Sequence, residues 1–154
     1  MAKTLTSTSK AASTRKIDTL LAHYGSSHKN ATNELIHFFA IPLIMLSIVG
    51  LMYALHPWVA FAFMAASMVY YARLSTVFLI AMIVWAALLF WCITLMGDNV
   101  WQTSLIIFVG AWIAQFIGHH LEGKKPSFFE DIQYLWVGPL FVLSKLFEKV
   151  GIKW

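Results

Sequence analysis

The chain alternates between long apolar runs and short polar breaks, and this pattern predicts membrane-spanning helices. Apolar runs of roughly 18 or more residues can cross a hydrocarbon core about 30 Å thick. Four segments approach or reach that length, namely Phe38–Leu55, Pro57–Ala72, Thr76–Met96 and Gln102–Gly118. The second is short, so we expect Trp58, Tyr70 and Tyr71 at its ends to lie at the membrane interfaces.

A fifth apolar segment, Ile132–Phe147, contains the adjacent pair Gly138 and Pro139. Proline interrupts helical hydrogen bonding, so this segment is predicted to be a kinked span, a re-entrant element or a helix lying in the interface. The linkers between the other runs are very short, which predicts antiparallel neighbours. The expected fold is therefore all-α, a polytopic membrane helical bundle with four spanning helices and this additional C-terminal helix.

Composition strengthens the membrane interpretation. The chain is 60% hydrophobic and 12% charged, whereas soluble domains are about 25% charged. A single domain of this size cannot bury so much apolar surface, so we expect membrane lipid to cover part of it. Residues 1–16 are rich in Ser, Thr and Lys and are predicted to form a flexible polar tail. Residues 17–154 are predicted to form one transmembrane domain.

The basic residues indicate how the bundle is oriented. If the four segments span, all 11 Lys and Arg residues fall on the same side of the membrane. This asymmetry predicts cytoplasmic termini, in a bacterial inner membrane or the endoplasmic reticulum. The net charge of +4 does not indicate nucleic acid, because the basic residues flank apolar spans and form no stripe on a soluble face. The single cysteine, Cys92, excludes an intramolecular disulfide and a Cys-based metal site.

Four of the six histidines lie in two polar patches beside apolar runs, at residues 28–37 and 115–122. In the first patch Asn30 is a candidate N-cap, and Asn33 and His37 are spaced to share one helical face. His28 precedes the cap and could fold back toward that face. The predicted topology places both patches at the cytoplasmic end of the bundle, where they can meet.

In the second patch, Gln115, His119 and Glu122 fall on one helical face, and His120 is rotated about 100° away. Imidazole is the commonest protein metal ligand. Two or three histidines with a carboxylate suit non-heme Fe(II) chemistry with O₂. The side-chain amides of Asn33 and Gln115 could orient such ligands by hydrogen bonding to them.

A plainer interpretation stands beside this one, since interfacial histidines are often solvated or cap helices. His23, in a polar stretch, and His56, in a turn before Pro57, are interpreted in that way. A zinc or heme site is a third option, although heme would favour histidines deeper within facing spans.

The residues of the two patches resemble the motifs of the 2-hydroxy fatty acid dioxygenase family of small membrane proteins. The resemblance covers roughly residues 17 to 150 and is carried by Tyr24, His28, Asn30, Asn33, His37 and Pro42, then Gln115 to His119, Glu122, Pro126, Asp131 and Pro139. Two positions depart from the family pattern. Ala40 replaces a glycine of the first motif, and Glu122 follows His119 one residue sooner than in fungal members.

The resemblance implies an Fe(II)-dependent α-oxidation, catalysed by a non-heme iron dioxygenase. A long-chain 2-hydroxy fatty acid would react with O₂ and leave a fatty acid one carbon shorter. The essential histidines of the family correspond to His28, His37 and His119, which are the expected metal ligands and catalytic residues, with His120 and Glu122 as further candidate ligands.

Two lysines are candidates for binding the substrate. Lys124 or Lys125 could attract the substrate carboxylate, although either could simply be solvated or face lipid. The alternative function is a non-catalytic small membrane transporter or assembly protein with interfacial histidines. A transporter should carry polar groups at mid-membrane or show inverted repeats, and these spans are apolar between their ends.

Overall fold

The computed structural model describes residues 15–26, 30–123 and 134–154, and every regular element in these ranges is helical. The all-α fold class predicted from the sequence is therefore confirmed for the described residues. The elements are α1 (Lys16–Ser26), α2 (Ala31–Leu55), α3 (Pro57–Ala72), α4 (Thr76–Met96), the 3₁₀ turn η1 (Gly97–Asn99), α5 (Val100–Leu121), the 3₁₀ turn η2 (Tyr134–Trp136) and α7 (Val137–Val150).

The helix boundaries follow local capping chemistry. The side chain of Asn30 caps α2 as predicted, because its Oδ1 accepts hydrogen bonds from the backbone N–H groups of Thr32 and Asn33 at 2.9 and 3.3 Å. This cap starts α2 at Ala31, well before the apolar run at Phe38. His56 Nδ1 accepts from the N–H of Trp58 at 3.2 Å at the start of α3, so the interpretation of His56 as a turn residue is confirmed.

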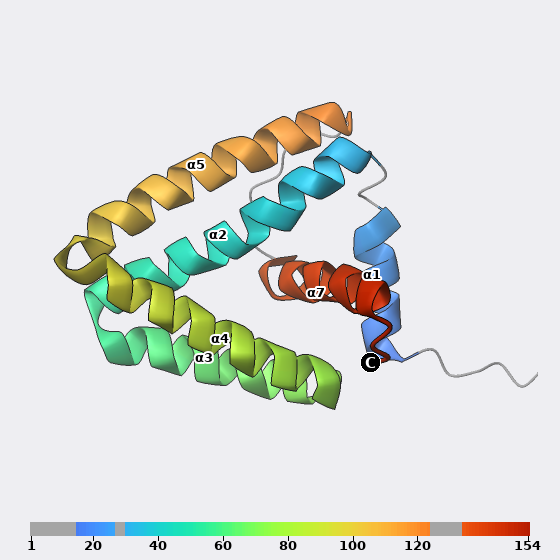
Figure 1. Cartoon of the computed structure of the whole chain (residues 1–154), viewed down its shortest axis with the longest axis horizontal. Helices are drawn as coiled ribbons and strands as arrows, with labels where there is room; N and C mark the ends of the chain where they lie inside the picture. Colours follow the sequence, from blue (N-terminus) through green and yellow to red (C-terminus); the bar gives the residue numbers. More distant parts are fainter. Residues whose placement is uncertain (1–14, 27–29, 124–133) are drawn as a thin grey trace, which may run out of the picture.

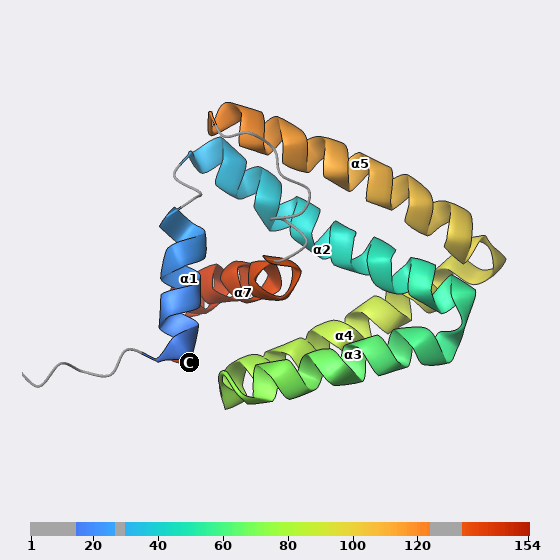
Figure 2. The same cartoon turned by 180° about the vertical axis from the view of Figure 1, so that it is seen from behind.

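The helices form two diverging pairs. Figure 1 shows α2 beside α5 and α3 beside α4, with the pairs meeting at the end that contains η1 and the α2–α3 turn. Toward the other end the pairs separate, and α7 lies between them with α1 packed against it (Figure 2). The N-terminus of α2 and the C-terminus of α5 lie together at this open end (Figure 1).

Helix α7 fills the space between the pairs. Its first eight residues are all buried, from Val137 to Ser144. Leu140 of α7 belongs to the main core with Tyr71 of α3 and Phe78 of α4, all three fully buried. Pro139 lies in the first turn of α7, where backbone N–H groups have no intrahelical partner, and it therefore does not interrupt the helix.

Two stretches of helix are long and apolar enough to cross a membrane, judged by length and composition. They are Ala31–Leu55, which is α2, and Thr76–Leu121, which joins α4, η1 and α5. Pro57–Ala72 is apolar but shorter. Large apolar side chains are exposed on the outside of the bundle, including Leu55, Trp58, Leu95 and Ile106. The four-span topology and the placement of α7 relative to a membrane stay predictions.

Candidate metal centre

The polar ends of α2 and α5 approach so closely that one position requires glycine. A Cβ atom placed on Gly118 would lie 2.4 Å from Oδ1 of Asn33 and 3.4 Å from Cε1 of His37. The first distance is shorter than any ordinary non-bonded contact. The absence of a side chain at Gly118 therefore lets α5 lie directly against the polar face of α2.

His37 is held in a defined orientation and, when neutral, in a single tautomer. Its side chain is 1% exposed, and its Nδ1 lies 2.9 Å from the backbone carbonyl oxygen of Asn33. A carbonyl oxygen only accepts hydrogen bonds, so in neutral His37 the proton is on Nδ1 and the lone pair is on Nε2. A histidine whose Nδ1 donates to a carbonyl is the arrangement usual for a metal ligand.

His119 reaches the same point from α5. The ring centroids of His37 and His119 are 5.2 Å apart, with the two ring planes at 87°. The prediction that the two histidine patches meet is therefore confirmed, although α3 and α4 separate them along the chain. His120 is exposed, on a different side of α5.

Glu122 fastens the second patch to the first. Its carboxylate accepts hydrogen bonds from the backbone N–H of Asn30, at 3.0 and 3.2 Å, and from Nδ2 of Asn33 at 2.9 Å. A carboxylate at the N-terminus of α2 also interacts favourably with the helix dipole. We call these three contacts the Glu122 clasp. The sequence suggests Glu122 as a metal ligand and gives no sign of this connection to α2.

The described residues supply part of a metal-binding set. Among them, no group of three or more His, Cys, Asp or Glu side chains is placed to hold a metal ion. His28, the third histidine expected from the sequence, lies outside the described residues, as do Lys124 and Lys125. The His37–His119 pair fits a metal site as two neighbouring imidazoles, one of them with its Nε2 lone pair fixed by a hydrogen bond at Nδ1.

Most of the chain matches a known protein family. Residues 14–150 match the family described as 2-hydroxy-palmitic acid dioxygenase Mpo1-like. The chain belongs to this family. The match confirms the resemblance seen in the two histidine motifs, and it spans all the candidate ligands. No curated protein and no solved structure matches the chain.

Two polar residues of this Mpo1-like chain were expected to support the ligands. The backbone carbonyl of Asn33 accepts a hydrogen bond from His37 Nδ1, whereas the side-chain amide of Asn33 donates to Glu122 and not to an imidazole. Gln115 is 4% exposed, and no hydrogen bond joins its Oε1 to either imidazole in the described part of the chain. Its role in orienting a ligand stays a prediction.

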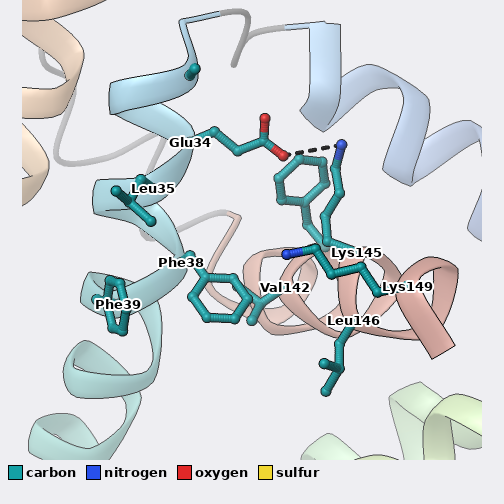
Figure 3. Close-up of a pocket in the computed structure, with 10 residues that line it drawn as sticks. Glu34, Leu35, Phe38, Phe39, Val142, Lys145, Leu146 and Lys149 are labelled. Atoms are coloured by element: carbon teal, nitrogen blue, oxygen red, sulfur yellow. Dashed lines mark ion pairs between the residues drawn. The ribbon is translucent and has the colours of Figure 1, made fainter.

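An apolar groove of the Mpo1-like chain lies away from the histidine pair. It has a volume of about 280 Å³ between α2 and α7, and its walls include Leu35, Phe38, Phe39, Phe141 and Leu146. Glu34, Lys145 and Lys149 line the groove as well, and Figure 3 shows the ion pair between Glu34 and Lys145, whose charged atoms are 3.0 Å apart. Glu34 directly follows Asn33, and Phe38 directly follows His37. Each therefore lies about 100° around α2 from the polar face. The groove thus opens on another side of the helix from His37.

Proposed function

We propose that this protein is an Fe(II)-dependent dioxygenase that converts long-chain 2-hydroxy fatty acids to fatty acids one carbon shorter. The observation that carries the proposal is the juxtaposition of His37 and His119 at the clasped ends of α2 and α5. Family membership supports the substrate class, because the family is described as acting on 2-hydroxy-palmitic acid.

In this proposal His37 and His119 hold the iron together with His28, which the sequence motif supplies. His120 and Glu122 are less suited as ligands. His120 is exposed, and the Glu122 carboxylate accepts hydrogen bonds from α2. Bound Fe(II) would supply coordination positions at which O₂ and the substrate can be brought together.

The protein groups around the pair have definable tasks. The carbonyl of Asn33 keeps the proton of neutral His37 on Nδ1, so that Nε2 would be available as the lone-pair donor to the iron. Burial of His37 excludes water from that side of the site. The substrate carboxylate would remain near the polar end of the bundle, where Lys124 or Lys125 could attract it, while the acyl chain extends along the apolar helices.

The proposed membrane arrangement suits such a substrate. We propose that α2, α3, α4 and α5 span the bilayer with both chain termini in the cytoplasm, in a bacterial inner membrane or the endoplasmic reticulum. The basic residues support this orientation, since all of them fall on one side of such a topology. The histidine pair would then lie at the cytoplasmic interface, where a fatty acid carboxylate meets water and its chain meets lipid.

The test begins with anaerobic purification of the full chain and transition-metal analysis, followed by incubation with 2-hydroxypalmitate and O₂. We expect about one iron per chain and formation of pentadecanoate, measured by mass spectrometry. His37→Ala and His119→Ala should lose both iron and product.

His56→Ala is the matched control, because His56 caps α3 at the opposite end of the bundle. It should retain both iron and product formation. Purified protein without a stoichiometric transition metal would rule out the proposal, and undiminished activity in the His37 or His119 variant would rule out the assignment of the ligands.

A further inference from the structure

A small cavity lies directly beyond the histidine pair, toward the middle of the bundle. Its volume is about 20 Å³, and it is lined by Tyr24, Ile41, Ile44, Trp112, Gln115, Tyr134, Leu135 and Gly138. Two of these residues are one helical turn from the candidate ligands. Ile41 follows His37 by four residues on α2, and Gln115 precedes His119 by four residues on α5. The space is sufficient for one group of the size of a water molecule.

Four residues that line this cavity carry polar side-chain groups, namely Gln115, Tyr24, Trp112 and Tyr134. Gln115 differs from the other three because its Oε1 atom is a pure hydrogen-bond acceptor. Its Oε1 atom is buried and has no hydrogen-bond partner in the described part of the chain. The side chains of Ile41, Ile44 and Leu135 in the same cavity carry no polar group. A buried acceptor without a donor destabilises a folded protein and is rare in native structures. Such an atom is explained if a bound molecule supplies the missing donor.

The chemistry of the proposed substrate identifies the donor. A 2-hydroxy fatty acid in its carboxylate form has one hydrogen-bond donor, the hydroxyl group on the carbon next to the carboxylate. A carboxylate oxygen cannot donate to Gln115 Oε1, and an unsubstituted fatty acid has no donor at this carbon. A carboxylate end near His37 and His119 would bring its neighbouring carbon to the cavity one turn away.

We infer that Gln115 Oε1 accepts a hydrogen bond from the 2-hydroxyl group of the substrate and thereby selects hydroxylated acids. This inference rests on the proposed function and extends it, because it gives Gln115 direct contact with substrate rather than with a metal ligand. A further consequence concerns stereochemistry. If both enantiomers bind with their carboxylate and acyl chain in the same positions, their hydroxyl groups point in different directions. Gln115 Oε1, which is fixed on one wall, can then reach the hydroxyl of only one enantiomer.

Enantiomers provide the sharpest test, because they partition equally into an achiral apolar phase and have equal acidity. The full chain is placed in phosphatidylcholine nanodiscs and loaded with Fe(II) in the absence of O₂, so that no turnover occurs. Binding of (R)- and (S)-2-hydroxypalmitate and of palmitate is then measured by competition with a radiolabelled 2-hydroxypalmitate. We expect the wild type to prefer one enantiomer roughly tenfold, the effect of one net hydrogen bond.

Gln115→Leu should abolish this preference while leaving palmitate binding unchanged. Gln102→Leu is the matched control, since Gln102 is exposed near the opposite end of the same helix, and it should keep the wild-type preference. Equal binding of both enantiomers to the wild type would overturn the inference, without need of a variant. So would a preference that persists in Gln115→Leu, or an equal loss of affinity for both enantiomers, which would indicate a structural role such as holding water.

The two proposals fail in different ways. If the wild type does not oxidise 2-hydroxypalmitate in the presence of O₂, the proposed function fails and the inference fails with it. If oxidation occurs but the enantiomer preference is absent or independent of Gln115, the inference alone is wrong.

Discussion

Gly118 has no Cβ atom, and both the close packing of α2 against α5 and the geometry of the histidine pair depend on this absence. A methyl group there would meet Asn33 Oδ1 at 2.4 Å, and Asn33 is held by the Glu122 clasp. Neither helix can therefore yield locally without disturbing His37, whose Nδ1 is bonded to the Asn33 carbonyl.

We predict that Gly118→Ala lowers the free energy of unfolding by about 1–3 kcal/mol, the usual cost of overpacking, and weakens metal binding. Gly110→Ala is the control on the same helix, because no atom lies within 4 Å of the position that its new methyl group would occupy. Alanine favours a helix by up to about 1 kcal/mol over glycine, so this variant should be neutral or slightly stabilised. Thermal unfolding in detergent and iron content measure both effects. Equal unfolding temperatures for the two variants would contradict the close approach.

At the scale of single residues, the sequence predicts whatever depends on local spacing. Asn30 caps α2, and Asn33 and His37 share a face, because both features depend on positions a few residues apart. The clasp between Glu122 and the N-terminus of α2 joins residues about ninety positions apart. No local pattern reveals such a bond, so the sequence does not predict the clasp, and the role of Glu122 as a metal ligand stays a prediction.

At the scale of the helices, α2 and α5 are in close contact at both ends of their interface. At the end away from the histidines, a Cβ on Gly50 would lie 2.1 Å from Oγ and 3.2 Å from Cβ of Ser104. Small residues at such points allow helix backbones to approach closely, as they do between membrane helices in general.

This contact predicts a compensating pair of substitutions. Gly50→Ala should destabilise the protein by about 1–3 kcal/mol. Adding Ser104→Gly removes both clashing atoms and should therefore restore most of this stability. The new glycine itself has a low helix propensity, so this part of the loss should remain. A double-mutant cycle on unfolding free energies measures the coupling between them. Additive effects of the two substitutions would show that the helices do not meet here.

The helices themselves are predicted more accurately than the way their ends are formed. The apolar runs locate α3 and α4 at their observed bounds and α5 within a few residues, because continuous apolar stretches are long and unambiguous. The apolar run at Phe38 begins after the start of α2, because the first turns of α2 are polar, and the predicted N-cap at Asn30 supplies the correct start. Gly138 and Pro139 suggest an interruption, but they occupy the first turn of α7, where proline is tolerated.

For the whole molecule, the two diverging pairs could not be predicted from hydrophobic periodicity. That pattern specifies short connections and antiparallel neighbours, and it leaves open whether the pairs stay parallel or separate. The separation depends on α7, whose buried first half occupies the space between α2 and α4. The separation of the two helix pairs is thus a property of tertiary packing, which cannot be read from a single sequence.

The proposed orientation in the membrane can be tested with single cysteines. In a Cys92→Ala background, Arg73→Cys is introduced in the α3–α4 turn and Asp98→Cys in η1, both at exposed positions and at opposite ends of the helices (Figure 1). A membrane-impermeant maleimide should label position 73 from the cytoplasmic face and position 98 from the opposite face, because the basic side of the chain is retained inside. Both should react after solubilisation in detergent. Labelling of both positions from the same face would exclude the four-span topology.

The Glu122 clasp also dictates when the site can come into existence during synthesis. Asn30 and Glu122 are 92 residues apart in the chain, and α3 and α4 are made between them. A growing polypeptide that ends within α4 contains His37 but has neither His119 nor Glu122. The histidine pair is therefore completed only after the intervening helices have been synthesised. A metal that needs both histidines could therefore be bound only after α3 and α4 have been synthesised, whereas α7, which follows Glu122 in the chain, could still be incomplete.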